Sequence, residues 1–227
     1  MLNTILNHPE VLTQLHETGE LETRLPELAR LFGVPQNAEH HPEVCTGRHT
    51  QMCLEMAARL KASPRVRFAV MTHDLGKGLT PPSEWPRHID HEIRGLEPVR
   101  HLCDRLQVPE DHRKLALLVC QWHLHAHQAF IMTSRSVLRF LDESGLAGDC
   151  SFLLEDFLLA CESDKRGRLG REGHPYFQAP FLKAVAKGLE NAGPDPAAGN
   201  RDCAQWQKWH HQRLSIVRAA REIHQKK

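Results

Sequence analysis

The apolar positions of the chain recur at helical spacing almost throughout, and the alternation typical of β-strands is scarce. The apolar residues within 11–15 and 21–32 predict two short amphipathic helices, closed by Gly33 and Pro35. The expected fold class is therefore all-α. The pattern predicts further helices over residues 46–61, 64–74, 90–106, 110–126, 134–142, 151–164, 180–191 and 202–225.

Residues typical of helix starts and ends divide the chain into predicted helices and loops. Ser63 and Pro64 are typical of an N-cap and a first helical position, while Gly76, Gly78 and two prolines after them predict a loop to about residue 87. Residues 165–176 predict a glycine-rich basic loop. We therefore expect one helical domain over residues 1–192, a linker over 193–201 and a C-terminal helix over 202–227.

Composition narrows the class of protein. The 227 residues suffice for a full core, and a net charge of +1 means that any basic surface must be local. The seven cysteines show no Cys-x-x-Cys spacing, which favours buried free thiols in a reducing cytoplasm over disulfides. There is no basic-then-apolar leader and no apolar stretch of about 18 residues. We therefore expect a cytoplasmic protein that does not span a membrane.

Histidine is the unusual component. The chain has 17 histidines, concentrated between His40 and His127, and this segment contains the pair His73-Asp74. Imidazole and carboxylate together can hold a hydrolytic metal ion while leaving positions open for water and substrate. Lys77, three residues after Asp74, can steady a phosphate as a point charge.

Two further candidate ligands fall at the ends of predicted helices. His49 lies near the start of the helix before His73, and Asp164 ends a later helix. Two histidines and two aspartates form a mixed nitrogen and oxygen site, which suits Mg²⁺, Mn²⁺, Ni²⁺ or Fe²⁺ better than a closed structural zinc. Taken in isolation, each of these two residues is more commonly a helix cap or a surface residue.

Other histidines share helix faces. His88 and His91 are three residues apart, and His123 and His127 are four apart. A single histidine on such a helix is more commonly a surface residue, but the repeated placement near predicted loops favours a site here. His91 and His123 are candidates for a second metal ion or for a substrate phosphate.

These positions together resemble the HD superfamily of metal-dependent phosphohydrolases. More narrowly, the chain is similar to the C-terminal HD domain of multifunctional bacterial CCA-adding tRNA nucleotidyltransferases, over roughly residues 5–190 and weakly beyond. The likeness rests on Leu31-Phe-Gly-Val-Pro35, His41-Pro-Glu-Val-Cys-Thr-Gly-Arg-His-Thr50, His73-Asp-Leu-Gly-Lys-Gly-Leu-Thr-Pro-Pro82, His91-Glu-x-x-Gly95, Trp85-Pro-Arg-His88, His123 and Asp164-Lys-Arg-Gly-Arg168.

The resemblance implies a helical HD bundle with an additional C-terminal helix. It assigns a set of primary metal ligands (His49, His73, Asp74 and Asp164) and two second-site or substrate ligands (His91 and His123). The implied cofactor is one or two divalent ions of Mg, Mn, Ni, Fe or Zn. The implied catalytic residues are Asp74 and Lys77, and the implied substrate-binding residues are Lys77, His88 and Arg168.

The resemblance also implies an activity. We expect a phosphohydrolase acting on nucleotides or RNA ends, of the 2′,3′-cyclic phosphodiesterase, 2′-nucleotidase or phosphatase type. Lys165, Arg166 and Arg171 either capture this anionic substrate or belong to a solvated loop. Nothing before residue 31 resembles the nucleotidyltransferase head of the family, so we expect that the chain does not add CCA by itself.

Two other functions stay open. One is a non-catalytic module that binds tRNA, another RNA or a protein partner through the last helix, although such a helix more commonly packs its apolar residues on the core. The other is a nucleoside triphosphate phosphohydrolase. Homodimer formation and a separate nucleotidyltransferase partner are also open. The candidate RNA-binding residues are Trp206, Trp209, His210, His211, Arg213, Arg218 and Arg221.

Overall fold

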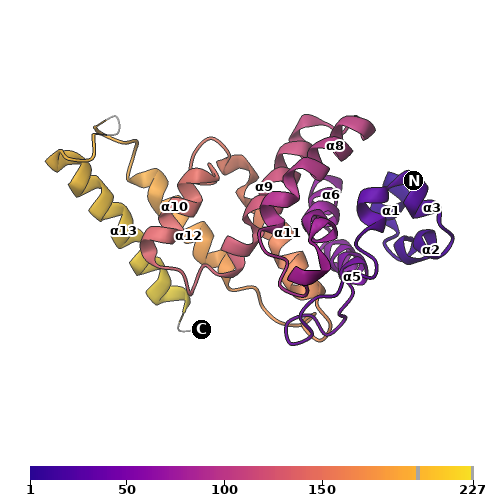
Figure 1. The fold of residues 1–227 in the computed structure, drawn as a ribbon. Coiled ribbons are helices and arrows are strands. Elements are labelled where there is room, and N and C mark those ends of the chain that lie inside the picture. The colour runs from indigo at the N-terminus through magenta and orange to yellow at the C-terminus, as the bar shows by residue number, and fades with distance from the viewer. Residues whose placement is uncertain (198–199, 226–227) are drawn as a thin grey trace. The chain divides into compact units, whose positions relative to one another are not determined.

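The computed structural model describes residues 1–197 and 200–225, and within them the regular elements are helices (Figure 1). Pro35 and Cys45 form an isolated antiparallel bridge. The all-α expectation is confirmed. The elements are α1 (Leu2–Asn7), α2 (Val11–Glu17), α3 (Glu20–Arg24), α4 (Pro26–Ala29), α5 (Thr46–Arg59), α6 (Pro64–Thr72), η1 (Leu75–Leu79), η2 (Pro82–Glu84), α7 (His91–Arg94), α8 (Leu96–Leu106), α9 (Glu110–His127), α10 (Ser134–Glu143), η3 (Ser151–Leu153), α11 (Leu154–Gly167), α12 (Gln178–Asn191) and α13 (Ala204–His224).

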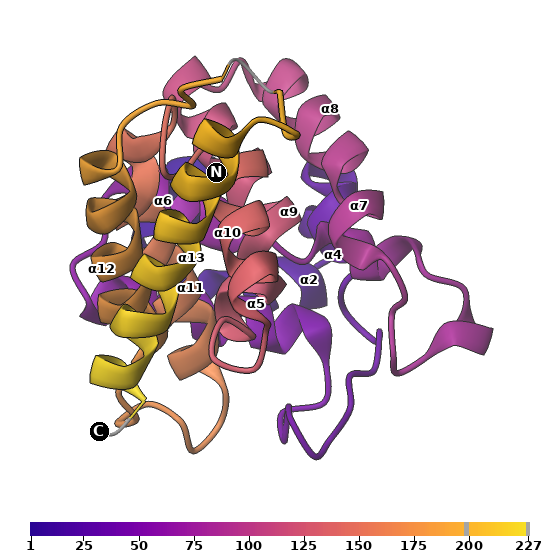
Figure 2. The same ribbon diagram turned by 90° about the vertical axis from the view of Figure 1, so that its left-hand side faces the viewer.

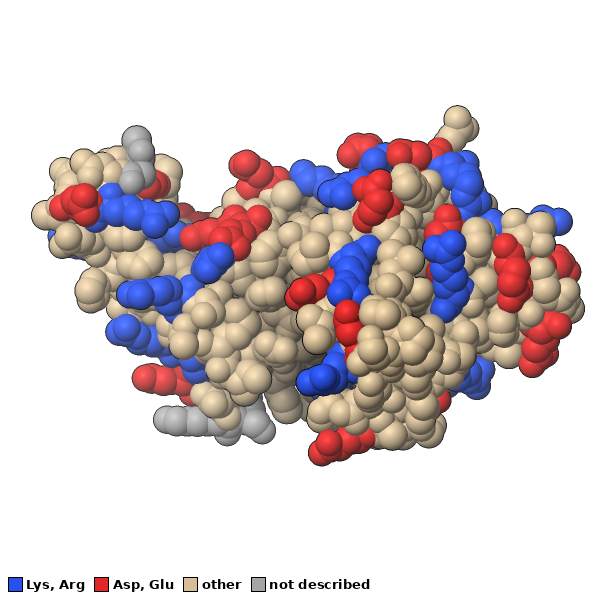
Figure 3. Space-filling model, viewed as in Figure 1, with Lys and Arg blue, Asp and Glu red and all other residues tan. Residues whose placement is uncertain are grey.

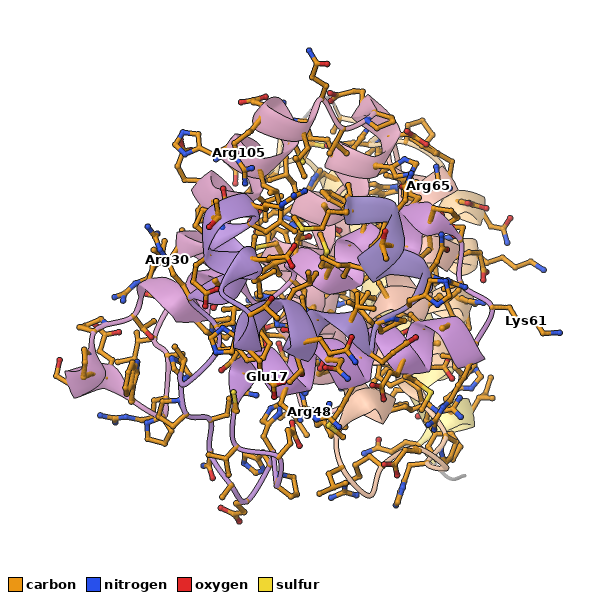
Figure 4. All side chains as sticks on the ribbon, turned by 90° about the vertical axis from the view of Figure 1, so that its right-hand side faces the viewer. Glu17, Arg30, Arg48, Lys61, Arg65 and Arg105 are labelled. Atoms are coloured by element: carbon orange, nitrogen blue, oxygen red, sulfur yellow. The ribbon has the colours of Figure 1, made fainter. Side chains whose placement is uncertain are left out.

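The first compact unit comprises Met1–Leu124 and Asp156–Tyr176. Within it α5 packs against α6, and the two helices lie side by side in Figure 1. Figure 4 views the molecule from the side of α1 to α3, with Arg30 and Lys61 extending away from the helices. Both residues are exposed, whereas Phe68 and Met71 of α6 are fully buried, as expected for a helix at the centre of a unit.

Helix α6 begins where its sequence predicts. The Ser63 hydroxyl accepts a hydrogen bond from the backbone N–H of Val66 at 3.3 Å, and Pro64 occupies the first helical position. Residues 68–72 are buried without interruption, so this short helix has no solvent face there. It therefore delivers the two residues that follow it, His73 and Asp74, into the interior of the first unit.

Several details differ from the sequence expectations, and the helix predicted within 21–32 is two short helices, α3 and α4. The predicted helix 90–106 is two helices, α7 and α8, separated at Gly95. The break after Asp74 is the 3₁₀-helix η1, and the N-terminal helix α1 was not predicted. The predicted loop 165–176 is wrong at its start, because α11 continues to Gly167. Arg166 stabilises this last turn through an ion pair with Glu162, four residues earlier.

The second compact unit comprises His125–Glu155 and Phe177–Lys227. Helix α13 packs on α10 and α12, as Figure 2 shows. Leu214 and Val217 of α13 are buried, and the guanidinium of Arg213 pairs with the carboxylate of Asp142 on α10. The C-terminal helix is thus part of the core of this unit. Ala198 and Gly199 of the predicted linker, and Lys226 and Lys227 of the predicted final helix, lie outside the described residues.

Two sequence expectations concern the cysteines and the membrane. All seven cysteines are free, and four of them (Cys53, Cys103, Cys120 and Cys161) are buried. Among the described residues, no helix combines the length and the apolar character needed to cross a lipid bilayer.

The glycines after Asp74 lead to a testable difference in stability. A Cβ atom at Gly76 would lie 1.9 Å from the carbonyl oxygen of His91, whereas one at Gly78 would lie 3.1 Å from Cβ of Arg30. We expect Gly76→Ala to reduce the free energy of unfolding by about 1–3 kcal/mol, because η1 and α7 must separate. Gly78→Ala is the matched control. Urea denaturation of both variants measures the difference, and equal stabilities would contradict this packing.

Candidate metal centre

Six predicted site residues come together in the first unit. His49 lies in α5, His73 and Asp74 lie between α6 and η1, and the other three lie in α7, α9 and α11. All six are buried, with exposed fractions between 0% and 6%. Close helix packing makes this convergence feasible, since a Cβ atom at Gly167 of α11 would lie 2.6 Å from Cα of Cys53 in α5. The three residues in α7, α9 and α11 are His91, His123 and Asp164, respectively.

Asp74 is the centre of the group. Its Oδ2 atom lies 3.2 Å from Nε2 of His73 and 4.0 Å from Nε2 of His49. Its Oδ1 atom lies 3.4 Å from Nε2 of His91 and 3.7 Å from Nε2 of His123. The two oxygens of one carboxylate therefore face two different pairs of histidines.

Asp164 contacts the same two histidines as Oδ2 of Asp74, namely His49 and His73. Its Oδ1 atom lies 3.1 Å from Nε2 of His49 and 3.9 Å from Nε2 of His73. Among the described residues, three candidate ligand sets are drawn entirely from these six residues, each with ligand atoms within 4.8 Å of one another. They are His49 with His73 and Asp74; His73 with His123 and Asp164; and Asp74 with His91 and His123.

The four histidines are oriented in the same way, with Nδ1 bonded away from the centre and Nε2 facing the carboxylates. Three of the Nδ1 atoms lie at hydrogen-bond distance from a backbone carbonyl, which can only accept, so we assign the proton of these rings to Nδ1. In the neutral form of each ring, the lone pair of Nε2 then faces Asp74 or Asp164. The Nδ1 contacts are His49 to Oε1 of Glu43 at 2.8 Å, His73 to the carbonyl of Val70 at 2.7 Å, His91 to that of His88 at 2.9 Å, and His123 to that of Val119 at 3.0 Å.

This donor set fits a divalent cation. Among the described residues, Nε2 of His73, Nε2 of His91 and Oδ1 of Asp74 are buried without a hydrogen-bond partner. Buried polar atoms without partners are costly, and with neutral rings these three atoms are acceptors that lack a donor. Imidazole nitrogens whose other ring nitrogen is hydrogen-bonded, combined with carboxylates, are typical ligands of divalent transition metals.

The comparison with known protein families agrees with this geometry. Residues 46–156 match the family model described as HD domain. The chain contains an HD domain. Five of the six clustered residues lie within the matched span, and Asp164 lies beyond its end. An HD domain supports a metal-dependent hydrolase in general.

Curated relatives match the HD domain and much of the surrounding chain. "Multifunctional CCA protein" of Xanthomonas campestris pv. campestris (strain B100) is 48% identical over 180 residues, which are 77% of this chain and 42% of that protein. Proteins of the same name are 45% identical over 187 residues in Methylococcus capsulatus (82% and 44%) and 40% identical over 221 residues in Pseudomonas fluorescens (96% and 54%). The chain thus spans about half the length of these relatives or less. No solved structure matches the chain.

Burial and nearby charges favour the metal-binding protonation states of two candidate ligands in the HD domain, Asp74 and His123. Burial disfavours the ionised form of Asp74, but the charges of His73 and Lys77 outweigh it and hold the pKa of Asp74 well below its usual value. Burial, reinforced by the charge of His73, holds the pKa of His123 well below its usual value. Burial also lowers the pKa of His73, but the Asp74 and Asp164 carboxylates raise it further, so the net shift is upward. Asp74 is therefore ionised and His123 neutral, as metal ligands must be, whereas His73 must release a proton when a metal binds.

Lys77 lies inside the protein beside Asp74. Its Nζ atom donates to Oδ2 of Asp74 at 2.7 Å and to Oε1 of Gln36 at 2.6 Å, and the residue is only 8% exposed. The lysine therefore neutralises the central carboxylate in this structure. Its predicted contact with a substrate phosphate stays a prediction, which requires Nζ to turn away from these partners.

The other two predicted substrate-binding residues also have partners within the protein. His88 donates from Nε2 to the carbonyl of Pro35 at 2.8 Å, and its Nδ1 lies 2.6 Å from the hydroxyl of Thr80. A substrate contact through His88 therefore requires one of these hydrogen bonds to break. Arg168 has its Nη2 atom 3.6 Å from Oδ1 of Asp164, next to the clustered ligands.

Sequence reasoning missed Glu43. Its side chain is 2% exposed, and one of its oxygens contacts Nδ1 of both His41 and His49, at 2.9 and 2.8 Å. Burial opposes ionisation of Glu43, but these two hydrogen bonds outweigh it and lower its pKa. Burial lowers the pKa of His41 to about 3, so this ring stays neutral. The run from His41 to Thr50, already prominent in the sequence, was the available signal.

Cys53 was also missed, although it lies one helical turn after His49. Its Sγ atom is 3.4 Å from Nε2 of His49, and the residue is fully buried. Burial, together with the charges of Asp164 and Asp74, raises the pKa of this thiol well above its usual value. The group at this edge of the centre is therefore an uncharged thiol.

Glu43 provides a test of the centre that does not depend on enzymatic activity. We expect Glu43→Ala to weaken Mn²⁺ binding by about 10- to 100-fold, because His49 loses the acceptor that orients its ring. Glu43→Gln should lie between this variant and wild type, since its amide oxygen still accepts from Nδ1. Competition with a fluorescent chelator measures the affinity, and exposed Glu39→Gln is the control. An unchanged affinity in Glu43→Ala would rule out this role.

Proposed function

We propose that the chain is a metal-dependent phosphohydrolase acting on nucleotides or RNA ends, through 2′,3′-cyclic phosphodiesterase, 2′-nucleotidase or phosphatase reactions. The observation that carries the proposal is the Asp74 carboxylate, each of whose oxygens faces its own pair of histidine Nε2 atoms. The HD domain supports hydrolysis, and relatives named "Multifunctional CCA protein" support a substrate related to tRNA.

Within this proposal, His49, His73, Asp74 and Asp164 hold one divalent ion. Asp74, His91 and His123 hold a second, since Oδ1 and Oδ2 of Asp74 face opposite groups. When bound, divalent ions lower the pKa of water and polarise a phosphoryl oxygen, which provides a hydroxide nucleophile near neutral pH.

The protein's own groups prepare this chemistry. Lys77 keeps Asp74 ionised, and Glu43 with the backbone carbonyls fixes the orientation of the histidine rings. Burial of all the proposed ligands excludes bulk water, which strengthens electrostatic interactions at the centre. Arg168 lies beside Asp164, which supports a role for its charge in balancing the non-bridging oxygens of a phosphate.

The number of ions can be measured directly. We expect metal-stripped wild-type protein to take up two equivalents of Mn²⁺, while His91→Ala and His123→Ala each take up one, because only the second set loses a ligand. Elemental analysis after desalting gives the stoichiometry. His101→Ala, an exposed histidine of α8, is the control. A single equivalent in wild type would contradict the two-ion arrangement.

Activity is the decisive test. The purified chain is stripped of metal, reloaded separately with Mg²⁺, Mn²⁺, Ni²⁺, Fe²⁺ or Zn²⁺, and assayed on a 2′,3′-cyclic nucleotide, a 2′-nucleotide and a nucleoside triphosphate. We expect His73→Ala and Asp74→Ala to lower the rate by more than about 100-fold, since losing a ligand exceeds the effect of losing its hydrogen-bond partner. His101→Ala should retain the wild-type rate.

Two outcomes would change the assignment. If wild type is no faster than His73→Ala with every metal, the protein is not a phosphohydrolase on these substrates. Binding of tRNA with a steep salt dependence but without hydrolysis would then favour a binding module. Preference for the nucleoside triphosphate over both ribose phosphates would place the substrate in a different class.

A further inference from the structure

The second unit contains a pocket built from charged and aromatic side chains. It lies between α10 and α13 and has a volume of about 670 Å³, within the range of small-molecule sites. Its lining includes Arg135, Arg139, Asp142, Arg201, Trp206 and His210. Figure 3 shows lysine and arginine side chains over the surface formed by α13, at the left of the view, with acidic side chains among them.

The charges of this pocket do not cancel. Asp142 is paired with Arg213, and Arg139 is paired with Glu143 at 2.7 Å. Within residues 1–197 and 200–225, neither Arg135 nor Arg201 forms an ion pair with an acidic side chain. Two arginines are thus available to an anion, and guanidinium groups suit phosphate oxygens in particular.

The pocket also has a flat aromatic wall. The rings of Trp206 and His210 are stacked, with centroids 4.6 Å apart and an angle of 11° between their planes. Burial, followed by the nearby charges of Arg135 and Arg213, lowers the pKa of His210, so the ring adds no charge at neutral pH. A neutral aromatic surface beside unpaired arginines is the combination on which a nucleobase stacks while its phosphate is held.

Three other residues of α13, Trp209, Arg213 and Arg221, have structural roles. Trp209 donates its indole N–H to the carbonyl of Gly193 at 3.1 Å, and the guanidinium of Arg213 lies 4.4 Å from the centre of its ring. Arg221 donates to the carbonyls of Ala129 and Met132. These contacts hold α13 in place. They leave Trp206 and His210 as the aromatic groups of α13 that line the pocket.

We propose that the pocket of Arg135, Arg201, Trp206 and His210 binds a nucleotide, with its base against the Trp206–His210 stack and its phosphate on the two arginines. Free nucleotides and the unpaired nucleotides of an RNA strand share this chemistry. This site lies in the second compact unit and uses none of the proposed metal ligands. It therefore stands independently of the proposed hydrolysis.

Binding is measured with the full chain in EDTA, so that the metal centre holds no divalent ion. Isothermal titration calorimetry with AMP, and fluorescence anisotropy with a labelled hexa-adenylate, give the two affinities. We expect saturable binding of AMP, of the oligonucleotide or of both. Similar affinities would identify the ligand as a free nucleotide, and at least 10-fold tighter binding of the oligonucleotide would identify an RNA strand.

Matched variants locate the binding. Trp206→Ala should weaken it by about 5- to 100-fold because stacking is lost, and Trp206→Phe should restore most of the affinity. Arg135→Glu and Arg201→Glu should each weaken it by at least 10-fold. Arg218→Glu, an exposed arginine of α13 outside the pocket lining, carries the same charge change and should have less than a 2-fold effect.

Two results would overturn the proposal. One is the absence of saturable binding of both ligands in EDTA by a folded protein, as checked by circular dichroism. The other is an equal loss in Arg218→Glu and Arg135→Glu, which would show that binding follows overall charge and not this pocket.

Discussion

The burial of two carboxylates, Asp74 and Asp164, among four histidine rings is the constraint on which the first unit depends. A buried charge without compensation is strongly destabilising, so every element that carries a neighbour of these groups must approach closely. Lys77 and Arg168 supply positive charge at either side of the group. Glycine at 76 and 167 removes the side chains that would keep the elements apart. In this part of the molecule, close packing of the elements is therefore what allows the buried charges to be compensated.

The sequence predicted the parts of the centre that are encoded locally. Ser63 and Pro64 define where α6 begins, and from there the helix carries His73 and Asp74 inward. His49 and Asp164, 115 residues apart, were candidates from their places at the ends of predicted helices and were assigned as primary ligands by the resemblance to the HD superfamily. The structure brings their side chains to 3.1 Å. Glu43 could not be derived from periodicity, because it lies in an irregular segment and its role depends on tertiary contacts.

The polar residues of the C-terminal helix illustrate a second limit. Sequence treats Trp206, Trp209 and Arg213 alike, as basic and aromatic residues on one helix. In the structure, Arg213 and Trp209 are used to fasten α13 to its surroundings, while Trp206 lines a pocket. Composition alone cannot separate these uses, since the difference lies in which groups of α10 and of the preceding segment face each side chain.

The hydrogen bonds that orient the histidines determine which mutations such a centre can accept during evolution. His73, His91 and His123 rely on carbonyl groups of the main chain, at Val70, His88 and Val119. A main-chain carbonyl is present whatever side chain its residue carries. Substitution at Val70 or Val119 can therefore alter the packing around the centre while leaving the acceptor in place. Among these four histidines, only His49 depends on an acceptor that mutation can delete, which makes Glu43 the vulnerable point in the orientation of the rings.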